Sequence, residues 1–180
     1  MSGRREAGRE KRDKKALSTP HQEEKHPFSS PLSFRAARSP TASLTRRVTF
    51  AAAHRYHRPE WTDERNQQVF GACANPHFHG NSYVCDVTVS GPIDDDTGMV
   101  VDLGKLDSAL DREVRARFDH RNINLEVEEF GEGRLVPTGE NLARFIFFKV
   151  RDQIGSDVAI ERVVVREDES LWAEYSGRGS

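Results

Sequence analysis

The stretch Thr45-Arg-Arg-Val-Thr-Phe-Ala-Ala-Ala-His54 decides the fold, because apolar side chains recur at every second position along it. Neighbouring side chains of an extended strand point to opposite faces of a sheet. From Val48 to His54 the even-numbered positions share one face, and that face is apolar except for the histidine. The pattern predicts a strand with one buried face, on which His54 lies among the core side chains.

Outward from this stretch, the sequence predicts a second strand, two helices and a C-terminal hairpin. These cover a strand over 83–90, an amphipathic helix from the N-cap Asp102 to Phe118, a helix from 137–138 to about 154, and strands over 157–167 and 170–176. Two strands, two helices and two strands predict an α+β domain, an antiparallel sheet with both helices on one face. The apolar surface of the 138–154 helix is wider than one core face needs, which suggests that a second subunit packs against it. The long polar segment 57–80 is expected to be a functional loop.

Residues 1–44 differ in composition from the rest of the chain. They hold 10 of the 27 Lys and Arg residues and 5 of the 29 Asp and Glu residues, so their net charge of +5 leaves −7 for the remainder of a chain whose total is −2. They are rich in Ser, Pro and Thr and have no hydrophobic periodicity. We therefore expect a disordered basic N-terminal tail, followed by one domain over 45–177. A basic arm can bind nucleic acid, but the acidic body argues against such a partner.

The sequence predicts a cytoplasmic protein that no membrane segment anchors. No stretch approaches the roughly 18–20 consecutive apolar residues of a membrane span, and the N-terminus lacks the apolar centre of a secretory signal. Acidic residues interrupt the basic ones near the N-terminus, which argues against a transit peptide. With two cysteines, Cys73 and Cys85, the chain has no predicted disulfide framework.

Three histidines are candidate metal ligands, namely His54 at the end of the first strand and His77 and His79 just before the second. Two side chains separated by one residue of extended chain point to the same side, so this pair can face His54 on a neighbouring strand. Three imidazoles with an open fourth position are typical of catalytic zinc. Two other interpretations stay open: a buried histidine without a metal, and a closed structural site with Cys73 as the fourth ligand.

Acid–base and binding candidates lie elsewhere in the chain. Cys73 is in a polar loop, whereas Cys85 alternates with core positions and is expected to be an inert thiol. Asp119 follows the first predicted helix, where it can orient His120 and stabilise its cation. Glu167 shares a strand face with apolar residues, and a carboxylate that faces inward needs a partner. Each of these features is also common in a purely structural role.

Six motifs occur in order along residues 45–177. They are Phe50-Ala-Ala-Ala-His54, Cys73-Ala-Asn-Pro-His-Phe-His-Gly-Asn-Ser-Tyr83, Gly98-Met-Val-Val-Asp102, Phe118-Asp-His-Arg-Asn-Ile-Asn124, Pro137-Thr-Gly-Glu-Asn141 and Val165-Arg-Glu167 through Tyr175. Together they resemble the 6-pyruvoyltetrahydropterin synthase and 6-carboxytetrahydropterin synthase family. No single motif is decisive, but six in the right order are highly specific.

The resemblance implies a fold, an assembly and a set of roles. The fold is the tunnelling fold, in which ββααββ subunits form barrels, usually a homohexamer with active sites at subunit interfaces. The roles are zinc bound by three histidines, Cys73 as a base assisted by Asp119 and His120, and Glu167 as the carboxylate that anchors the pterin. Thr138 and Glu140 match the family's second pterin-contacting motif.

At one metal position the chain departs from the family. Counted back from Tyr83, the family's two loop ligands fall on His79 and Asn81, and an amide oxygen is a poorer zinc ligand than imidazole. Counted forward from Cys73, a shorter spacing found in some members selects His77 and His79. We favour His54, His77 and His79 as the ligands, and His79 is common to both registers.

The resemblance also implies a lyase that acts on 7,8-dihydroneopterin triphosphate. Because the short spacing from Cys73 to His77 is similar to that of the carboxy-forming enzymes, the favoured product is 6-carboxy-5,6,7,8-tetrahydropterin, a precursor of deazapurines such as queuosine. The alternatives are elimination of triphosphate to the pyruvoyl product, and a member that binds pterin or zinc without catalysis. Side-chain cleavage to a hydroxymethyl pterin is less favoured, because enzymes of that group usually carry Glu at the position of Cys73.

Overall fold

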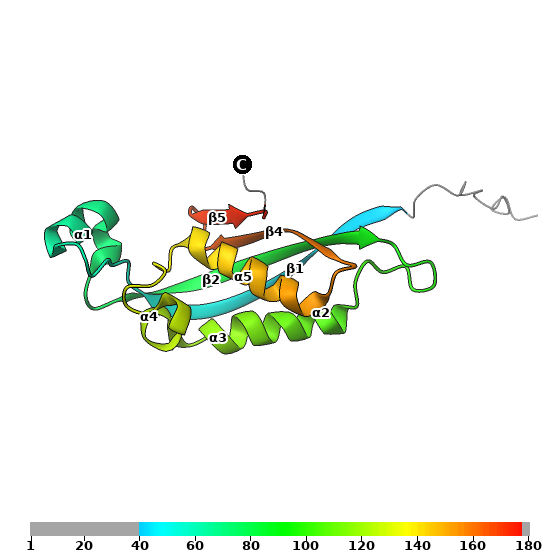
Figure 1. Cartoon of the computed structure of the whole chain (residues 1–180), viewed down its shortest axis with the longest axis horizontal. Coiled ribbons are helices and arrows are strands. Elements are labelled where there is room, and N and C mark those ends of the chain that lie inside the picture. The colour runs from blue at the N-terminus through cyan, green and yellow to red at the C-terminus, as the bar shows by residue number, and fades with distance from the viewer. Residues whose placement is uncertain (1–39, 178–180) are drawn as a thin grey trace, which may run out of the picture. The chain divides into compact units, whose positions relative to one another are not determined.

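The computed structural model describes residues 40–177, which form one five-stranded sheet with helices packed on it (Figure 1). Its centre is a long antiparallel ribbon of β1 (Thr41–His54) and β2 (His79–Pro92), each of 14 residues. The ribbon pairs His54 with His79, so the last residue of β1 lies opposite the first residue of β2. The strand begins four residues before the predicted domain start at 45, and the tail prediction for 1–39 lies outside the described residues.

The sheet order is β3-β1-β2-β4-β5, and the predicted α+β architecture is confirmed. β4 (Ala159–Arg166) and β5 (Trp172–Tyr175) form the C-terminal hairpin, and β4 pairs antiparallel with β2. The strand β3 (Arg121–Asn122) runs parallel to β1. The sequence does not predict this pairing, because a strand of two residues is too short to show a periodic pattern.

Both predicted helices form, and each begins at a side-chain cap. Asp102 accepts hydrogen bonds from two backbone amides at the start of α2 (Leu103–Leu110), which continues through one π-helical turn (Asp111–Arg115) into α3 (Ala116–Phe118). Thr138 caps α5 (Gly139–Ile154) by accepting from the amide of Asn141. In Figure 1 α2, α3 and α5 lie on the same side of the sheet, where their apolar side chains close the core.

Much of the aromatic surface of α5 is covered within the chain, so the width of that surface does not by itself indicate a second subunit. Phe145 packs against Phe118 and Phe130, with ring centroids 5.9 and 5.3 Å away. On the other side, Phe147 packs against Tyr175 of β5 at 5.2 Å. The short segment around Phe130 and the edge strand β5 therefore supply the partners that the helix pattern left unassigned.

The predicted loop over 57–80 contains ordered structure. Thr62 caps the helix α1 (Asp63–Phe70), and a 3₁₀ turn (Gly71–Ala74) follows it. The helix presents no continuous apolar stripe, so hydrophobic periodicity could not reveal it. Another short helix, α4 (Ile123–Glu126), and a 3₁₀ turn (Glu128–Phe130) connect β3 toward α5. Among the described helices, none has the length and apolar character needed to cross a membrane.

Candidate active site

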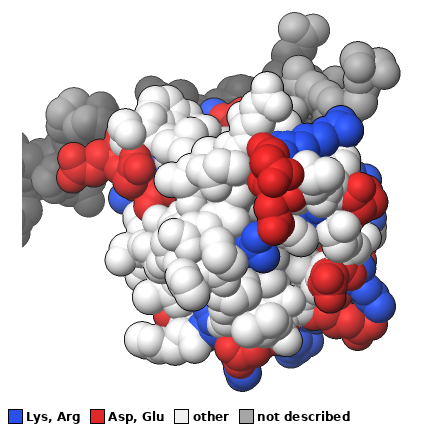
Figure 2. Space-filling model, turned by 90° about the vertical axis from the view of Figure 1, so that its left-hand side faces the viewer, with Lys and Arg blue, Asp and Glu red and all other residues white. Residues whose placement is uncertain are grey.

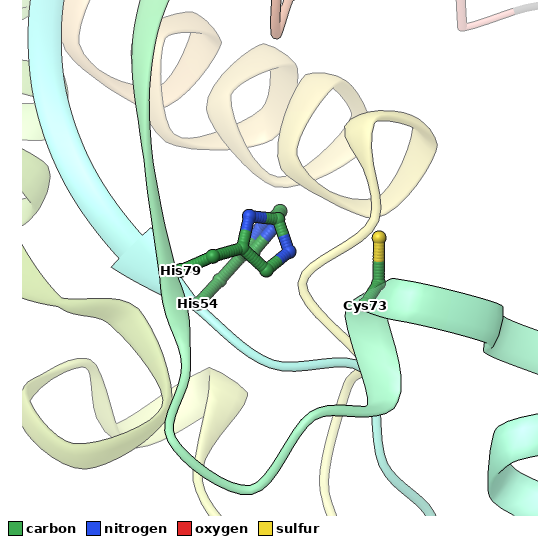
Figure 3. Close-up of side chains that lie close together, drawn as sticks. All are labelled: His54, Cys73 and His79. Atoms are coloured by element: carbon green, nitrogen blue, oxygen red, sulfur yellow. The ribbon is translucent and has the colours of Figure 1, made fainter.

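His54 and His79 face each other where the β1–β2 ribbon ends. Their Nε2 atoms are 3.1 Å apart, and His54 is fully buried (Figure 3). Tyr83, four residues further along β2 than His79, places its hydroxyl 2.7 Å from Nδ1 of His54. That contact fixes the ring, so the other ring nitrogen points at His79. Such an outer partner is typical of metal-binding histidines.

Cys73 completes a group of three possible metal ligands. It lies on the 3₁₀ turn after α1, and its Sγ and one ring nitrogen of each histidine all lie within 4.8 Å of one another. Figure 3 shows it on a separate segment beside the two imidazoles. The amide of Tyr56 donates to the carbonyl of Cys73 at 2.8 Å, which ties that segment to the end of β1.

Burial sets the ionisation of this group. Desolvation, with a contribution from nearby His79, lowers the pKa of His54 to about 4, so its ring is neutral near pH 7 and can bind a cation through a lone pair. Burial and the charge of Glu167 both raise the pKa of the Cys73 thiol. The protonated thiol of Cys73 is therefore favoured, and a nearby cation or proton acceptor is needed to generate the thiolate that can act as a base.

The spacing of His54 and His79 fits two ligands of a tetrahedral metal ion, and the side chain of Asn81 lies beside them. A nitrogen separation of 3.1 Å is close to the edge of a tetrahedron, roughly 3.3 Å for Zn–N bonds of about 2.0–2.1 Å. The amide of Asn81 lies 3.3 Å from Nε2 of His54 and 3.4 Å from the hydroxyl of Tyr83. Two imidazoles and one amide group therefore converge at the end of the ribbon.

His77 does not join His54 and His79. Its side chain is exposed, and its backbone amide donates to Asn75 in the loop. The rule that positions two apart share a face holds only in extended chain, and Phe78 has φ of 60°, in the left-handed region. The chain turns at that residue and becomes extended from His79 onward, so Asn81, not His77, shares the side of His79.

A cavity of about 250 Å³ lies next to this group, and all three residues predicted to contact a pterin line it. Its buried carboxylate is Glu167, only 8% exposed, whose Oε1 accepts a hydrogen bond of 2.8 Å from the hydroxyl of Tyr56. Thr138 and Glu140 line it from the start of α5. The remaining wall is mainly apolar and includes Val69, Phe70, Val165, Leu171, Trp172 and Ala173.

Gly139 keeps this cavity open. A Cβ at this position would lie 3.1 Å from Cβ of Ala173 and 3.5 Å from Oε1 of Glu167. Burial raises the pKa of Glu167, and the hydrogen bond from Tyr56 opposes that rise. Seen from the α1 end in Figure 2, much of the surface is uncharged, and acidic and basic side chains lie next to one another around its margin.

Asp119 and His120 lie apart from these groups, on the edge of the sheet. Oδ1 of Asp119 accepts from the amide of Ala51 at 2.9 Å, and the amide of His120 donates to the carbonyl of the same residue. The His120 side chain is 85% exposed, with its Nε2 3.8 Å from Oδ2 of Asp119. The single chain does not bring this pair into the group of His54, Cys73 and His79.

Two contact residues were missing from the sequence-based set. Tyr56 bonds Glu167, and Tyr83 bonds His54. Alternation along β1 could have indicated the first, because Tyr56 lies two positions after His54. Alternation along β2 could have indicated the second in the same way, because it places Tyr83 on the buried face with Cys85.

Comparison with known proteins agrees with this geometry. A family model described as 6-pyruvoyl tetrahydropterin synthase matches residues 43–178. The 6-pyruvoyl tetrahydrobiopterin synthase of Drosophila melanogaster is 39% identical over 78% of this chain and 83% of its own length, and the human one is 35% identical over 76% and 92%. The solved 6-pyruvoyl tetrahydropterin synthase of Caenorhabditis elegans is 33% identical, covers 79% of this chain and 99% of its own, and superposes with a TM-score of 0.73.

These relatives correct the prediction of a carboxy-forming, queuosine-pathway enzyme, because each bears the name of the pyruvoyl-forming synthase. The preference for the carboxy product rested on the spacing from Cys73 to His77, and the structure leaves His77 exposed in the loop. The tunnelling fold is confirmed by the likeness to the nematode structure. From residue 43 to residue 178, the chain belongs to the 6-pyruvoyl tetrahydropterin synthase family.

Proposed function

We propose that this chain is a 6-pyruvoyl tetrahydropterin synthase, a lyase that eliminates triphosphate from 7,8-dihydroneopterin triphosphate. The observation that carries the proposal is the proximity of a buried carboxylate and a histidine–cysteine group. Tyr56 touches both, since its hydroxyl bonds Glu167 and its ring packs 4.7 Å from that of His54. A substrate held by one end at Glu167 would place its side chain toward His54, His79 and Cys73.

Glu167 would hold the pterin ring. An ionised carboxylate can accept two parallel hydrogen bonds from the amino group and the ring N–H of a pterin edge, as it does from a guanidinium. Thr138 and Glu140 line the same cavity and would contact the ring from the start of α5. The apolar wall, which includes Phe70 and Trp172, suits a flat heterocycle.

For the metal, we propose zinc bound by His54 and His79, with the amide oxygen of Asn81 as the third protein ligand in place of His77. The oxygen and nitrogen of an amide are assigned from their partners, so a half-turn of the Asn81 side chain would point its oxygen at the metal. Zinc would supply a Lewis acid for the side-chain hydroxyls of the substrate. Tyr83 would keep the ring of His54 oriented toward it.

Cys73 would move the protons. Elimination takes a proton from one side-chain carbon and releases triphosphate from a neighbouring carbon, and Cys73 lies beside the metal group, where those carbons would be. His120, oriented by Asp119, would accept the proton. Because this pair lies on the sheet edge, we propose that it comes from a second copy of the chain, in the hexamer that the resemblance implies.

A second candidate is a family member that binds pterin or zinc without catalysis, and Asn81 favours it. An amide binds zinc more weakly than an imidazole does, so the site could be empty at cellular zinc concentrations. The two candidates differ in turnover and not in pterin binding.

Incubation of the purified protein with 7,8-dihydroneopterin triphosphate tests both candidates. We expect stoichiometric release of triphosphate and a product with the mass of 6-pyruvoyl tetrahydropterin. A product with the mass of the carboxy compound, together with acetaldehyde, would contradict the proposal. Binding of a pterin without turnover, even after zinc is added, would favour the non-catalytic candidate.

A further inference from the structure

Glu167 has a partner in this chain that the pterin-anchoring role does not require. The hydroxyl of Tyr56 donates to Oε1 of Glu167 at 2.8 Å, and both residues line the cavity. Tyr56 follows β1 and Glu167 follows β4, so the bond connects segments that are 111 residues apart in sequence. Because the two segments are both anchored in the fold, this bond restricts the orientation of the Glu167 carboxylate.

Three further contacts hold Tyr56 in this position. Its amide donates to the carbonyl of Cys73 at 2.8 Å. Its ring packs against His54, with centroids 4.7 Å apart, and edge-on against Phe70 at 5.9 Å. The hydroxyl that reaches Glu167 is therefore on a side chain fixed at its backbone and on two sides of its ring.

The bond leaves acceptor capacity on Glu167. A carboxylate has two oxygens with about four lone-pair sites, and the Tyr56 hydroxyl occupies one of them. Oε2 and a second site on Oε1 stay free for a planar donor edge. Burial raises the pKa of Glu167 and would favour its neutral form, in which one oxygen becomes a donor and can no longer accept from a pterin N–H.

We propose that Tyr56 is a positioning residue for the pterin: its hydroxyl fixes the plane of the Glu167 carboxylate, so that the carboxylate accepts the amino edge of the ring. The proposal deepens the proposed function and rests on it. It predicts that Tyr56 contributes to affinity and to recognition of the amino group, and not to the proton transfers at the side chain.

The chain contains three tyrosines, which supply a matched series of single-hydroxyl deletions. Tyr56→Phe removes the bond to Glu167, and Tyr83→Phe removes the bond to His54. Tyr175→Phe is the control, since Tyr175 lies in β5 with its ring against Phe147 and Phe148. All three keep the aromatic ring, and thermal melting reports whether each variant is folded.

Binding of neopterin, a fluorescent pterin without phosphate, gives a readout that is independent of turnover. The matching lumazine, with oxygen in place of the amino group, tests recognition of that group. For Tyr56→Phe we expect neopterin affinity to fall at least about tenfold, because the lost bond involves a charged acceptor, and selectivity over the lumazine to fall with it. KM should rise by a similar factor, with kcat within about threefold. Tyr83→Phe should instead lower zinc content and kcat, and Tyr175→Phe should change none of these.

A double-mutant cycle with Glu167→Gln separates positioning from a general structural role. If Tyr56 acts through the carboxylate, Tyr56→Phe should change neopterin affinity less than about twofold in the Glu167→Gln background. An equal loss in both backgrounds, or an equal loss for neopterin and lumazine, would overturn the proposal. If Tyr56→Phe melts well below the wild type, Tyr56→Met repeats the test without the ring or the hydroxyl.

The outcomes also separate this inference from the proposed function. Turnover and neopterin binding by the wild type, with Tyr56→Phe unchanged in affinity, would overturn the positioning role and leave the function standing. A wild type that neither turns over dihydroneopterin triphosphate nor binds neopterin would overturn both.

Discussion

The Glu167 cavity and the Asp119–His120 pair differ in how many of the groups that they need are supplied by a single chain. Segments that lie far apart in the sequence meet at the cavity, from Tyr56 after β1 to Trp172 in β5, and its carboxylate already has a hydrogen-bond partner. The pair is anchored to β1 through Ala51, yet its imidazole is 85% exposed, and among the described residues it does not belong to the group of His54, Cys73 and His79.

The difference indicates which steps a single chain can perform. Recognition of a flat ring needs a preformed cavity, which the described residues supply. The proton transfer that we propose would need Cys73 and His120 near the same carbon, and one chain holds them apart. Pterin binding should therefore survive changes that abolish turnover, and the following experiments are chosen to separate the two.

The largest effect is expected from Cys73→Ala. A positioned base contributes about 10²–10⁴-fold, so turnover should fall by that factor, while neopterin binding and zinc content stay at wild-type values. Cys85→Ala is the control, because Cys85 is a fully buried core thiol whose loss should lower stability and not turnover per folded chain. If Cys73→Ala also lowers zinc content, the thiolate is a metal ligand and not the base.

Mixed assemblies test whether the pair comes from a second copy. His120→Ala should lose turnover about 10²-fold on its own, as one acid–base partner does. Chains of Cys73→Ala and His120→Ala that are unfolded and reassembled together should recover roughly a quarter of wild-type turnover, because chance pairing joins one intact copy of each residue at about one site in four. No recovery, with both variants shown to share oligomers, would place the whole proton-transfer machinery in one chain.

A smaller effect is expected at the metal position. Asn81→His supplies a third imidazole beside His54 and His79 and should tighten zinc binding at least about tenfold. His77→Ala should leave zinc per subunit unchanged, because that side chain is exposed in the loop. Zinc can be measured by competition with a chromogenic chelator. Loss of zinc in His77→Ala would contradict this expectation and support His54, His77 and His79 as the ligands.

The smallest effect is expected from removal of residues 1–39, which precede the first described strand. Assembly, zinc content and turnover should equal those of the full chain within experimental scatter, because the matched family region begins at residue 43. Size-exclusion chromatography and the triphosphate-release assay check this on the same preparation. A loss of turnover above about threefold would give that segment a role in the site.

Periodicity accounted for the parts of the fold that bury an apolar face. The alternation around Val48 predicted β1, and the spacing of apolar residues from Leu103 to Phe118 predicted the helix that α2 and α3 form. The polar helix α1 buries little, and the two-residue strand β3 depends on a partner that is distant in sequence, so neither has a local signal.

The sequence predicted which candidate side chains lie together where chemistry and register agree. His54 and His79 come together because a hairpin-like ribbon fixes their pairing, and the carboxylate of Glu167 faces inward from its strand. His77 was misplaced because a single backbone angle at Phe78 breaks the extended geometry that the spacing rule assumes. Alternation could have placed Tyr56 on the side of His54, but its bond to Glu167, 111 residues away, is seen only in the folded chain.

The backbone of His120 has a consequence for evolution of this chain. Its φ of 57° is in the left-handed region, where a side chain other than Gly, Asn or Asp adds about 1 kcal/mol of strain. His120→Gly should then melt no earlier than the wild type although it removes the imidazole. If His120 acts in proton transfer as we propose, its place in an exposed left-handed turn is a trade of stability for catalysis.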